Sequence, residues 1–361
     1  MIIAFYVGEM NYRGVVNSTY QLARYSKKLL KYKPIIFYDS KNKANKGDVI
    51  KKFKKKFKTF GISNFSNIEN FNKKYNFDFI YIQKGGVKDK FVSKEIKTLI
   101  HAVYPQKLNQ IHGYNYFYIS EWLAKKFSNS KLSYLPYIVE KNRSVKNLKK
   151  YLKIKNDQLV FGCHGGESSF DLKFAQDVLI RIANERDDIT FLFLNINKFC
   201  NHPKIKFLKG TINDSFKSKF INTCDAMIYG RSLGETFGLA CAEFAINNKR
   251  ILSYKYNRHQ NHNFSLSKDT FFEYSSYGEL YNLICDFQKK IIIPKKNKYL
   301  DCSPKKVMKL FKKIVMKPSS KLNTYDYFVN FINLNRMYYF YIRHKIYNHY
   351  YNLFAAKFWP K

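Results

Sequence analysis

Short apolar runs alternate with amphipathic stretches along most of the chain. The runs are bounded by glycine or polar residues, and their length and continuity predict buried strands. They are Ile2–Val7, Lys33–Tyr38, Phe77–Gln83, Gln158–Cys163, Ile189–Leu194, Ile205–Leu208, Ala226–Tyr229 and Arg250–Tyr254. The stretches with helical periodicity are Val15–Leu30, Leu172–Asn184 and Asn213–Asn222, and a strand ending at Ser120 leads into a helix at Glu121. This alternation predicts doubly wound α/β domains with parallel sheets.

A polar, basic stretch interrupts the pattern near the middle of the chain. The 361 residues are enough for two domains of ordinary size, each with its own core. We predict an N-terminal Rossmann-like domain over 1–140, a linker over 141–157 and a second Rossmann-like domain over 158–295. Residues 296–361, rich in Tyr, Phe, Lys and Arg, are predicted to form a helical tail.

One stretch of the second domain, CDAMIYGRSLGETFGLACAEFAINNKRILSY, predicts strand, loop, helix and strand. Small residues at the start of the helix let it lie close to a sheet. The loop Thr236–Leu239 would place the backbone N–H groups of Phe237, Gly238 and Leu239 at the helix N-terminus, where they favour a phosphate. Glu235 lies in the loop and Glu243 two turns into the helix. Spacing alone would fit two carboxylates on a solvated helix face equally well.

The segment Glu235-TFGLACA-Glu243 resembles the E-x7-E motif of retaining GT-B glycosyltransferases of the group 1, family 4-like kind. The resemblance is strongest over 158–254 and weaker over 1–140. It implies a GT-B fold, with two Rossmann-like domains facing a cleft. It also implies transfer of a sugar from a UDP- or GDP-sugar donor with retention, without metal and without another cofactor. Glu243 would then accept the ribose hydroxyls, and Glu235 would hold the sugar.

The resemblance also suggests residues elsewhere in the chain. The family has a histidine near the donor sugar, which His101 matches best and His112 second, although a lone histidine is more often structural. The loop after the first strand faces the phosphates and acceptor in the family, which makes Gly14 and Arg13 candidates. Thr211 and Ile212 occupy the loop that contacts the base, and Leu132–Val139 resembles the proline-containing strand that closes the N-terminal domain.

The loop HGGESSFDLK after Cys163 is rich in glycine and serine, and backbone N–H groups in such loops cradle phosphates. Its candidate contacts are Gly165, Gly166 and Ser168. The loop departs from the family, which places an arginine directly after the strand, where this chain has Cys163 or His164. We therefore expect Lys173 and Arg231 to meet the charge of the diphosphate.

The formal net charge of +39, from 65 basic and 26 acidic side chains, implies an anionic partner. The run Lys46–Lys58 suits either a helix on an anionic membrane or a solvated helix with two aromatic anchors, and the tail suits either a membrane surface or packing on the first domain. The six cysteines show no zinc or disulfide spacing. Without a leader or a spanning apolar run, we expect a cytoplasmic protein, peripheral to the membrane where the basic stretches bind lipid.

Two other classes of protein remain open at this stage. The charge and the many aromatic side chains suit a nucleic-acid-binding protein, although no known reader motif is present. The atypical phosphate loop suits a GT-B domain that binds a ligand without catalysis. The chain also lacks a convincing D-x-D metal motif, since Asp187 and Asp188 lie at a predicted helix end.

Overall fold

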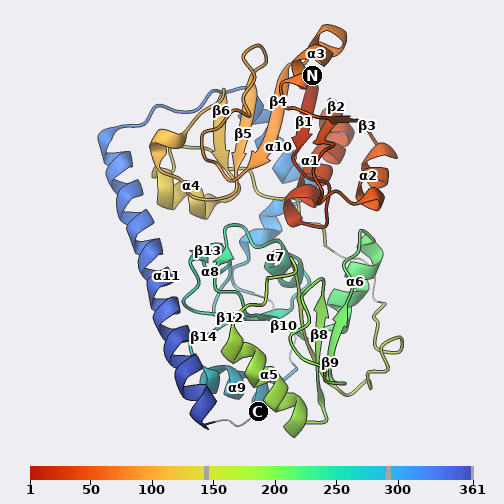
Figure 1. The fold of residues 1–361 in the computed structure, drawn as a ribbon, viewed down its shortest axis with the longest axis vertical. Helices are drawn as coiled ribbons and strands as arrows, with labels where there is room; N and C mark the ends of the chain where they lie inside the picture. The colour runs from red at the N-terminus through yellow and green to blue at the C-terminus, as the bar shows by residue number, and fades with distance from the viewer. Residues whose placement is uncertain (142–145, 290–293, 359–361) are drawn as a thin grey trace. The chain divides into compact units, whose positions relative to one another are not determined.

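The computed structural model describes residues 1–141, 146–289 and 294–358 (Figure 1). The chain forms two compact units. The first contains 1–139 and 301–335, and the second contains 140–300 and 336–361. The predicted linker thus belongs to the second unit, although its residues 142–145, like 359–361 of the tail, lie outside the described residues.

The first unit is built on a six-stranded sheet in the order β3-β2-β1-β4-β5-β6, with all neighbours parallel. Its strands are β1 (Ile2–Val7), β2 (Lys33–Asp39), β3 (Lys58–Ile62), β4 (Phe79–Lys84), β5 (Thr98–Ala102) and β6 (Asn115–Tyr118). The helices are α1 (Gly14–Leu30), α2 (Gly47–Lys54), α3 (Asn67–Tyr75), α4 (Glu121–Ser128) and α10 (Pro304–Val315), with a 3-10 turn at Leu108–Gln110. The strand order reverses between β1 and β4, as in Rossmann-like sheets.

The second unit repeats this topology in the order β14-β12-β10-β7-β8-β9. Its strands are β7 (Leu159–His164), β8 (Ile189–Leu194), β9 (Ile205–Leu208), β10 (Ala226–Tyr229), β12 (Arg250–Tyr254) and β14 (Phe271–Tyr274). A small separate sheet pairs β11 (Gly234–Glu235) with β13 (His259–Gln260). The helices are α5 (Lys173–Glu185), α6 (Asp214–Thr223), α7 (Leu239–Ala245), α8 (Asn261–Ser265) and α9 (Tyr277–Cys285), and a 3-10 turn follows at Lys298–Cys302. The two sheets confirm the predicted fold class.

One predicted strand is wrong. Within Leu132–Val139, only Tyr134 forms a bridge, to Tyr118, and the rest has no regular structure. Pro136 has no backbone N–H to donate to a sheet ladder, so the segment cannot pair continuously along its length. It is nevertheless fixed, because Leu135 N donates to Tyr118 O and Val139 N donates to Cys302 O.

The tail forms two helices. Within the first unit, α10 packs against α1, and its Phe311 ring contacts the rings of Tyr32 and Tyr81. The long dark blue helix α11 (Thr324–Phe358) contributes residues up to Asn335 to the first unit and the remainder to the second (Figure 1). Among the described residues, no helix combines the length and the apolar character needed to cross a bilayer.

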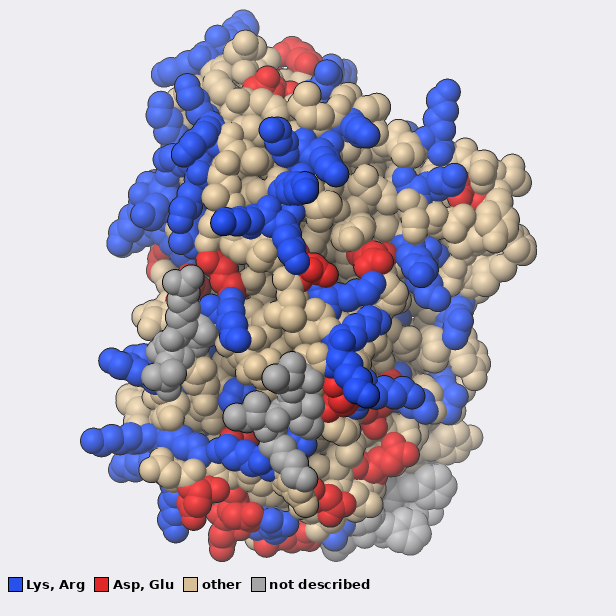
Figure 2. Space-filling view, turned by 180° about the vertical axis from the view of Figure 1, so that it is seen from behind, with Lys and Arg blue, Asp and Glu red and all other residues tan. Residues whose placement is uncertain are grey.

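The lysine-rich run around α2 matches the second of its two interpretations. Phe53 and Phe57 are buried, and both rings pack against Tyr20 of α1. The two aromatic side chains therefore anchor α2 to its own unit, so that only its lysines remain for a lipid surface. Lys and Arg side chains are spread over the face of the molecule in Figure 2, with Asp and Glu in smaller groups between them.

Candidate functional site

The candidate carboxylates lie in the second unit, beside the point where the strand order reverses. The strands β7 and β10 are neighbours in the sheet, and their last residues are His164 and Tyr229. In open parallel sheets, ligands bind outside the carboxyl ends of the two strands at such a reversal. The side chains of both last residues contact the predicted pair of acids.

Glu243 is buried in α7 between two basic groups. Its Oε1 lies 2.5 Å from the Lys217 Nζ of α6, and its Oε2 lies 3.0 Å from the His164 Nε2, an ion-pair distance without hydrogen-bond alignment. Burial by itself raises the pKa of this carboxyl, but the Lys217 ammonium and the His164 ring outweigh that effect and lower the pKa of Glu243 to about 2. Glu243 is thus an ionised carboxylate in a desolvated position.

Glu235 has different partners on the same side of the sheet. Its Oε1 accepts a hydrogen bond of 2.7 Å from the Tyr229 hydroxyl and one of 3.0 Å from Arg231 Nη1. Burial disfavours the charged guanidinium, yet the Glu235 carboxylate raises the pKa of Arg231 above its ordinary value. A side chain that we predicted as a phosphate contact is therefore paired with the first acid.

The loop that carries Glu235 contains two glycines with positive φ, one directly before Glu235 and one directly before α7. Gly234 has φ +67°, and a Cβ there would lie 2.1 Å from the His259 carbonyl oxygen. Gly238 has φ +84° and precedes α7. The carbonyl of Phe237 accepts hydrogen bonds from the Asn261 amide and the Tyr299 hydroxyl. Thr236 and Phe237 are buried and Leu239 is half-buried. The anion site at this helix end stays a prediction.

The glycine- and serine-rich loop after β7 already uses much of its hydrogen-bonding capacity. Gly166 N donates to Ser169 Oγ and Gly165 N to the Leu194 carbonyl, while the Gly165 carbonyl accepts from Asn195. Ser168 is exposed. A phosphate bound to the two glycine N–H groups would have to replace these bonds, so the predicted cradle is not preformed.

Two other predicted contacts of the second unit, Lys173 and Thr211, have bonding partners other than the two acids. Lys173 is half-exposed on α5 and pairs with Asp177 one turn later. Thr211 accepts a hydrogen bond from Asn213 N just before α6, and Ile212 follows it in the same loop. The partners of Lys173 and Thr211 are thus Asp177 and Asn213, and the roles of both residues in binding a donor stay predictions.

The predicted residues of the N-terminal domain belong to the first unit. His101 is 2% exposed, with Nδ1 2.6 Å from the Tyr81 hydroxyl and Nε2 2.9 Å from the Leu135 carbonyl, and burial lowers its pKa to about 3. This setting favours the structural alternative over a catalytic role. His112 is half-buried, with Nδ1 2.6 Å from the Gln110 carbonyl. Gly14 begins α1, and Arg13 pairs with Glu9 at the surface.

The structure adds Lys217, His164 and Tyr229 to the predicted site. His164 and Tyr229 had a signal in the sequence, because Tyr229 ends and His164 directly follows an apolar run that becomes a strand beside the reversal. Lys217 had none, since it is one of many lysines and its position depends on how α6 packs. No three His, Cys, Asp or Glu side chains gather into a possible metal site within the part of the chain that the structure describes.

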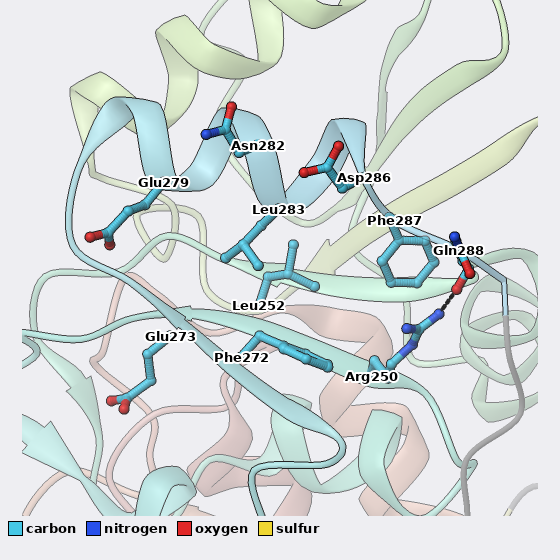
Figure 3. A pocket seen from close by; sticks show the side chains of 10 residues that line it. All are labelled: Arg250, Leu252, Phe272, Glu273, Glu279, Asn282, Leu283, Asp286, Phe287 and Gln288. Atoms are coloured by element: carbon cyan, nitrogen blue, oxygen red, sulfur yellow. Dashed lines mark hydrogen bonds between the residues drawn. The ribbon is translucent and has the colours of Figure 1, made fainter.

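A hollow of about 590 Å³ lies elsewhere in the second unit, between α9, the edge strand β14 and its neighbour β12 (Figure 3). Leu252, Leu283 and Phe287 point into it, and Arg250 donates to the Gln288 carbonyl at one end. Its lining includes neither Glu235 nor Glu243. The candidate site is therefore defined by the side chains at the carboxyl ends of β7 and β10 and not by this hollow.

The two doubly wound domains and the C-terminal helices define a GT-B fold. Anabaena HepE solved with UDP-glucose is 13% identical, with a TM-score of 0.65 over 88% of this chain and 98% of that one. A glycosyltransferase from Rickettsia africae is 14% identical, with a TM-score of 0.58 over 94% and 98% of the two chains.

A further solved structure with this fold is a UDP-N-acetylglucosamine 2-epimerase, described as provisional, from Listeria monocytogenes. It is 9% identical, with a TM-score of 0.53 over 90% of this chain and 93% of that one. No protein-family model matches the chain. No curated protein sequence matches it either. At these identities, the similarity shows the fold.

Proposed function

We propose that the protein is a glycosyltransferase that moves a sugar from a nucleotide-sugar donor to an acceptor. The observation that carries the proposal is the pair Glu235 and Glu243, held with their cationic partners beside the strand reversal of a GT-B domain. Further support comes from HepE, a protein of the same fold that was solved with UDP-glucose. We therefore propose UDP-glucose and related UDP-sugars as the first donors to test, with GDP-sugars second.

The two acids have separate roles in this proposal. Glu243, ionised and buried, accepts the ribose hydroxyls, and Glu235 accepts hydroxyls of the sugar. Negative charge builds on the leaving diphosphate in the transition state, so cationic donors aimed there contribute most to catalysis. We assign that task to Arg231 and Lys217, since both are held at the site by the two acids, whereas Lys173 pairs with Asp177.

The stereochemistry and the metal requirement follow the same proposal. We propose transfer with retention, and charge neutralisation by these side chains without a metal ion. For the acceptor, we propose a glycan, lipid or protein on the cytoplasmic side, reached from a peripheral position at the membrane. The buried setting of His101 leaves it with a positioning role in the first unit and not with contact to the sugar.

The decisive experiment is a titration of UDP- and GDP-sugars that follows both thermal stabilisation and slow donor hydrolysis. A transferase shows turnover with at least one donor. A binding module shows a thermal shift alone, and a nucleic-acid-binding protein shows neither. Conversion of the donor to its 2-epimer without transfer would instead assign the epimerase reaction.

The roles of the two acids can be separated by kinetics. Glu243→Ala should mainly weaken donor binding and raise KM, because ribose contacts persist through the reaction. Glu235→Ala should mainly lower kcat, by about tenfold or more, which corresponds to about 1.4 kcal/mol of transition-state stabilisation. Asp187→Ala, an exposed acid of the same unit, serves as the control. Equal and negligible effects of both variants would return the pair to a structural role.

A further inference from the structure

The helix α11 exposes large apolar side chains along much of its length. In the first unit, Phe328, Phe331 and Ile332 are 58%, 65% and 46% exposed. In the second unit, Tyr341 is 38% exposed, and the more exposed side chains are Tyr338, Tyr339, Ile342, Ile346 and Tyr350. Without Tyr341, we call these eight side chains the outer face of α11. Residues three or four apart share one side of a helix, so each of the two groups forms a stripe.

The side of α11 that packs on the protein is more polar than its outer face in the first unit. Asp326 is fully buried and Asn330 nearly so. The Asn330 amide donates to the carbonyls of Gln106 and Phe127, and Asp326 accepts from Asn323 N. A surface helix ordinarily turns its apolar side inward. On α11 the apolar side faces outward, and this arrangement indicates that the outer face binds another surface.

The second part of the helix is held in place by contacts on the side opposite its exposed outer face. The rings of Tyr347 and Tyr351 pack against Phe174, and the Tyr351 hydroxyl donates to Asp177. Arg343 donates to the Tyr256 hydroxyl and lies over that ring. The stripe from Tyr338 to Tyr350 extends about 18 Å at 1.5 Å per residue. It is therefore an ordered surface and not a frayed terminus.

The charged residues that α11 itself carries beyond Asp326 all have one sign. From Tyr327 to Phe358 the sequence contains no Asp or Glu, whereas Arg336, Arg343 and Lys345 lie among the apolar residues. A second copy of the chain would bring the same cations together without acidic partners, against a net charge of +39 on each copy. Isoleucine offers no ring on which a nucleic-acid base could stack, which disfavours that partner too.

We propose that the outer face of α11 docks on the surface of an anionic lipid bilayer. Tyrosine and phenylalanine suit the boundary between headgroups and acyl chains, isoleucine adds apolar area, and the cations meet lipid phosphates. The helix lies along the surface and does not cross it, in keeping with its many polar residues. The inference is independent of the proposed transferase activity, because docking requires no donor.

The test is flotation of the full chain with vesicles of phosphatidylcholine alone or mixed with phosphatidylglycerol. The protein should bind the mixed vesicles, and binding should weaken as salt rises. The double variant Ile342→Gln with Ile346→Gln should lose binding by at least about tenfold, because two exposed isoleucines that the proposal buries in the bilayer become polar. The matched control is Tyr151→Gln with Leu300→Gln, two exposed apolar residues of the same unit outside α11; it should bind as the unsubstituted chain does.

Unchanged melting temperatures would show that both variants fold, as expected for exposed positions. Equal vesicle binding by the two double variants would overturn the proposal. The proposal would also be wrong if the unsubstituted chain sedimented as a dimer and the α11 variant, but not the control, as a monomer. It would likewise be wrong if the α11 variant lost RNA binding and kept vesicle binding. Donor turnover is measured in parallel, so that a failure of the membrane proposal can be distinguished from a failure of the proposed transferase activity.

Discussion

Glu243 keeps a negative charge in a place where water scarcely reaches it. The desolvation cost of a buried carboxylate is compensated only when cationic or hydrogen-bonding groups lie close to it. The Lys217 ammonium is the cation here, and the His164 ring lies on the other side of the carboxylate. Removing the carboxylate would leave these two basic groups without that partner. The charge of Glu243 therefore supports the fold as well as the proposed binding of a donor.

Glu243→Gln should lower the free energy of unfolding at neutral pH by about 3 kcal/mol. The pKa of Glu243 is lowered from 4.5 to about 2, so the stabilisation is complete above pH 4.5 and is lost as the pH falls through about 2. Denaturant titrations of both proteins at a series of pH values would measure this difference. A difference that stays constant down to pH 2 would contradict the role of this carboxylate.

His101 offers a matching test in the first unit. His101→Asn should lower the free energy of unfolding by about 1 to 3 kcal/mol, because the Tyr81 hydroxyl and the Leu135 carbonyl lose a buried partner. The pKa of His101 is lowered from 6.5 to about 3. The advantage of the unsubstituted chain should therefore shrink as the pH falls below 6.5, where the unfolded chain binds the proton more readily. The half-buried His112→Asn is the control, and a stable His101→Asn protein with reduced turnover would restore the catalytic interpretation.

At the scale of elements, α10 completes the core of the first unit. Phe311 is fully buried against Tyr32 and Tyr81, and the Asn115 amide donates to the Ile314 and Lys317 carbonyls at the end of the helix. The part of the tail that we predicted to pack on the first domain or on membrane thus packs on the domain at α10. The basic surface of α10 still faces outward.

Phe311→Ala should destabilise the protein by about 3 to 5 kcal/mol, since it removes a fully buried ring and leaves a cavity. Met316→Ala, at a position that is 65% exposed directly after α10, should change stability by less than about 0.5 kcal/mol. Thermal or chemical unfolding followed by circular dichroism would measure both. Similar small effects of the two variants would mean that α10 packs loosely on its unit.

The strands could be predicted from the sequence because short continuous apolar runs that end at glycine or at a polar residue leave few alternatives. The bounds of β1, β8, β9, β10 and β12 agree with the predicted runs. Leu132–Val139 is equally apolar but contains Pro136, and the pattern of apolar residues does not encode a missing N–H donor. The outer face of α11 could not be predicted either, because the number of aromatic residues in a stretch does not show which of their side chains the fold buries.

In the candidate site too, residues that lie close together in the sequence could be predicted, whereas residues brought together by packing could not. The two acids and Arg231 were predicted from one local stretch, and the structure places Arg231 against Glu235. Lys217 comes from another helix, and its approach to Glu243 depends on how α6 packs beside α7. For His101, the resemblance suggested a histidine near the donor sugar. Only the packed structure shows that it lies within β5, with Tyr81 and the Leu135 carbonyl at its two ring nitrogens.

At the scale of the whole molecule, the net charge of +39 makes the folded chain repel itself. We expect the melting temperature to rise when ionic strength increases from about 0.01 M to about 0.15 M, because the Debye length shortens from about 30 Å to about 8 Å. Differential scanning calorimetry in sodium chloride would measure the change, with sucrose as an uncharged control. A melting temperature that falls with salt would mean that attractive ion pairs outweigh the repulsion.

The first unit is made of two stretches separated by most of the second unit, and this order matters while the ribosome is at work. All six strands of the first sheet are synthesised by residue 118, but Phe311 follows only after the whole second sheet. At about 5 to 20 residues per second, that delay is on the order of 10 to 40 s. During this time the nascent chain leaves the apolar surface around Tyr32 and Tyr81 uncovered, as a site where a chaperone can bind until α10 arrives.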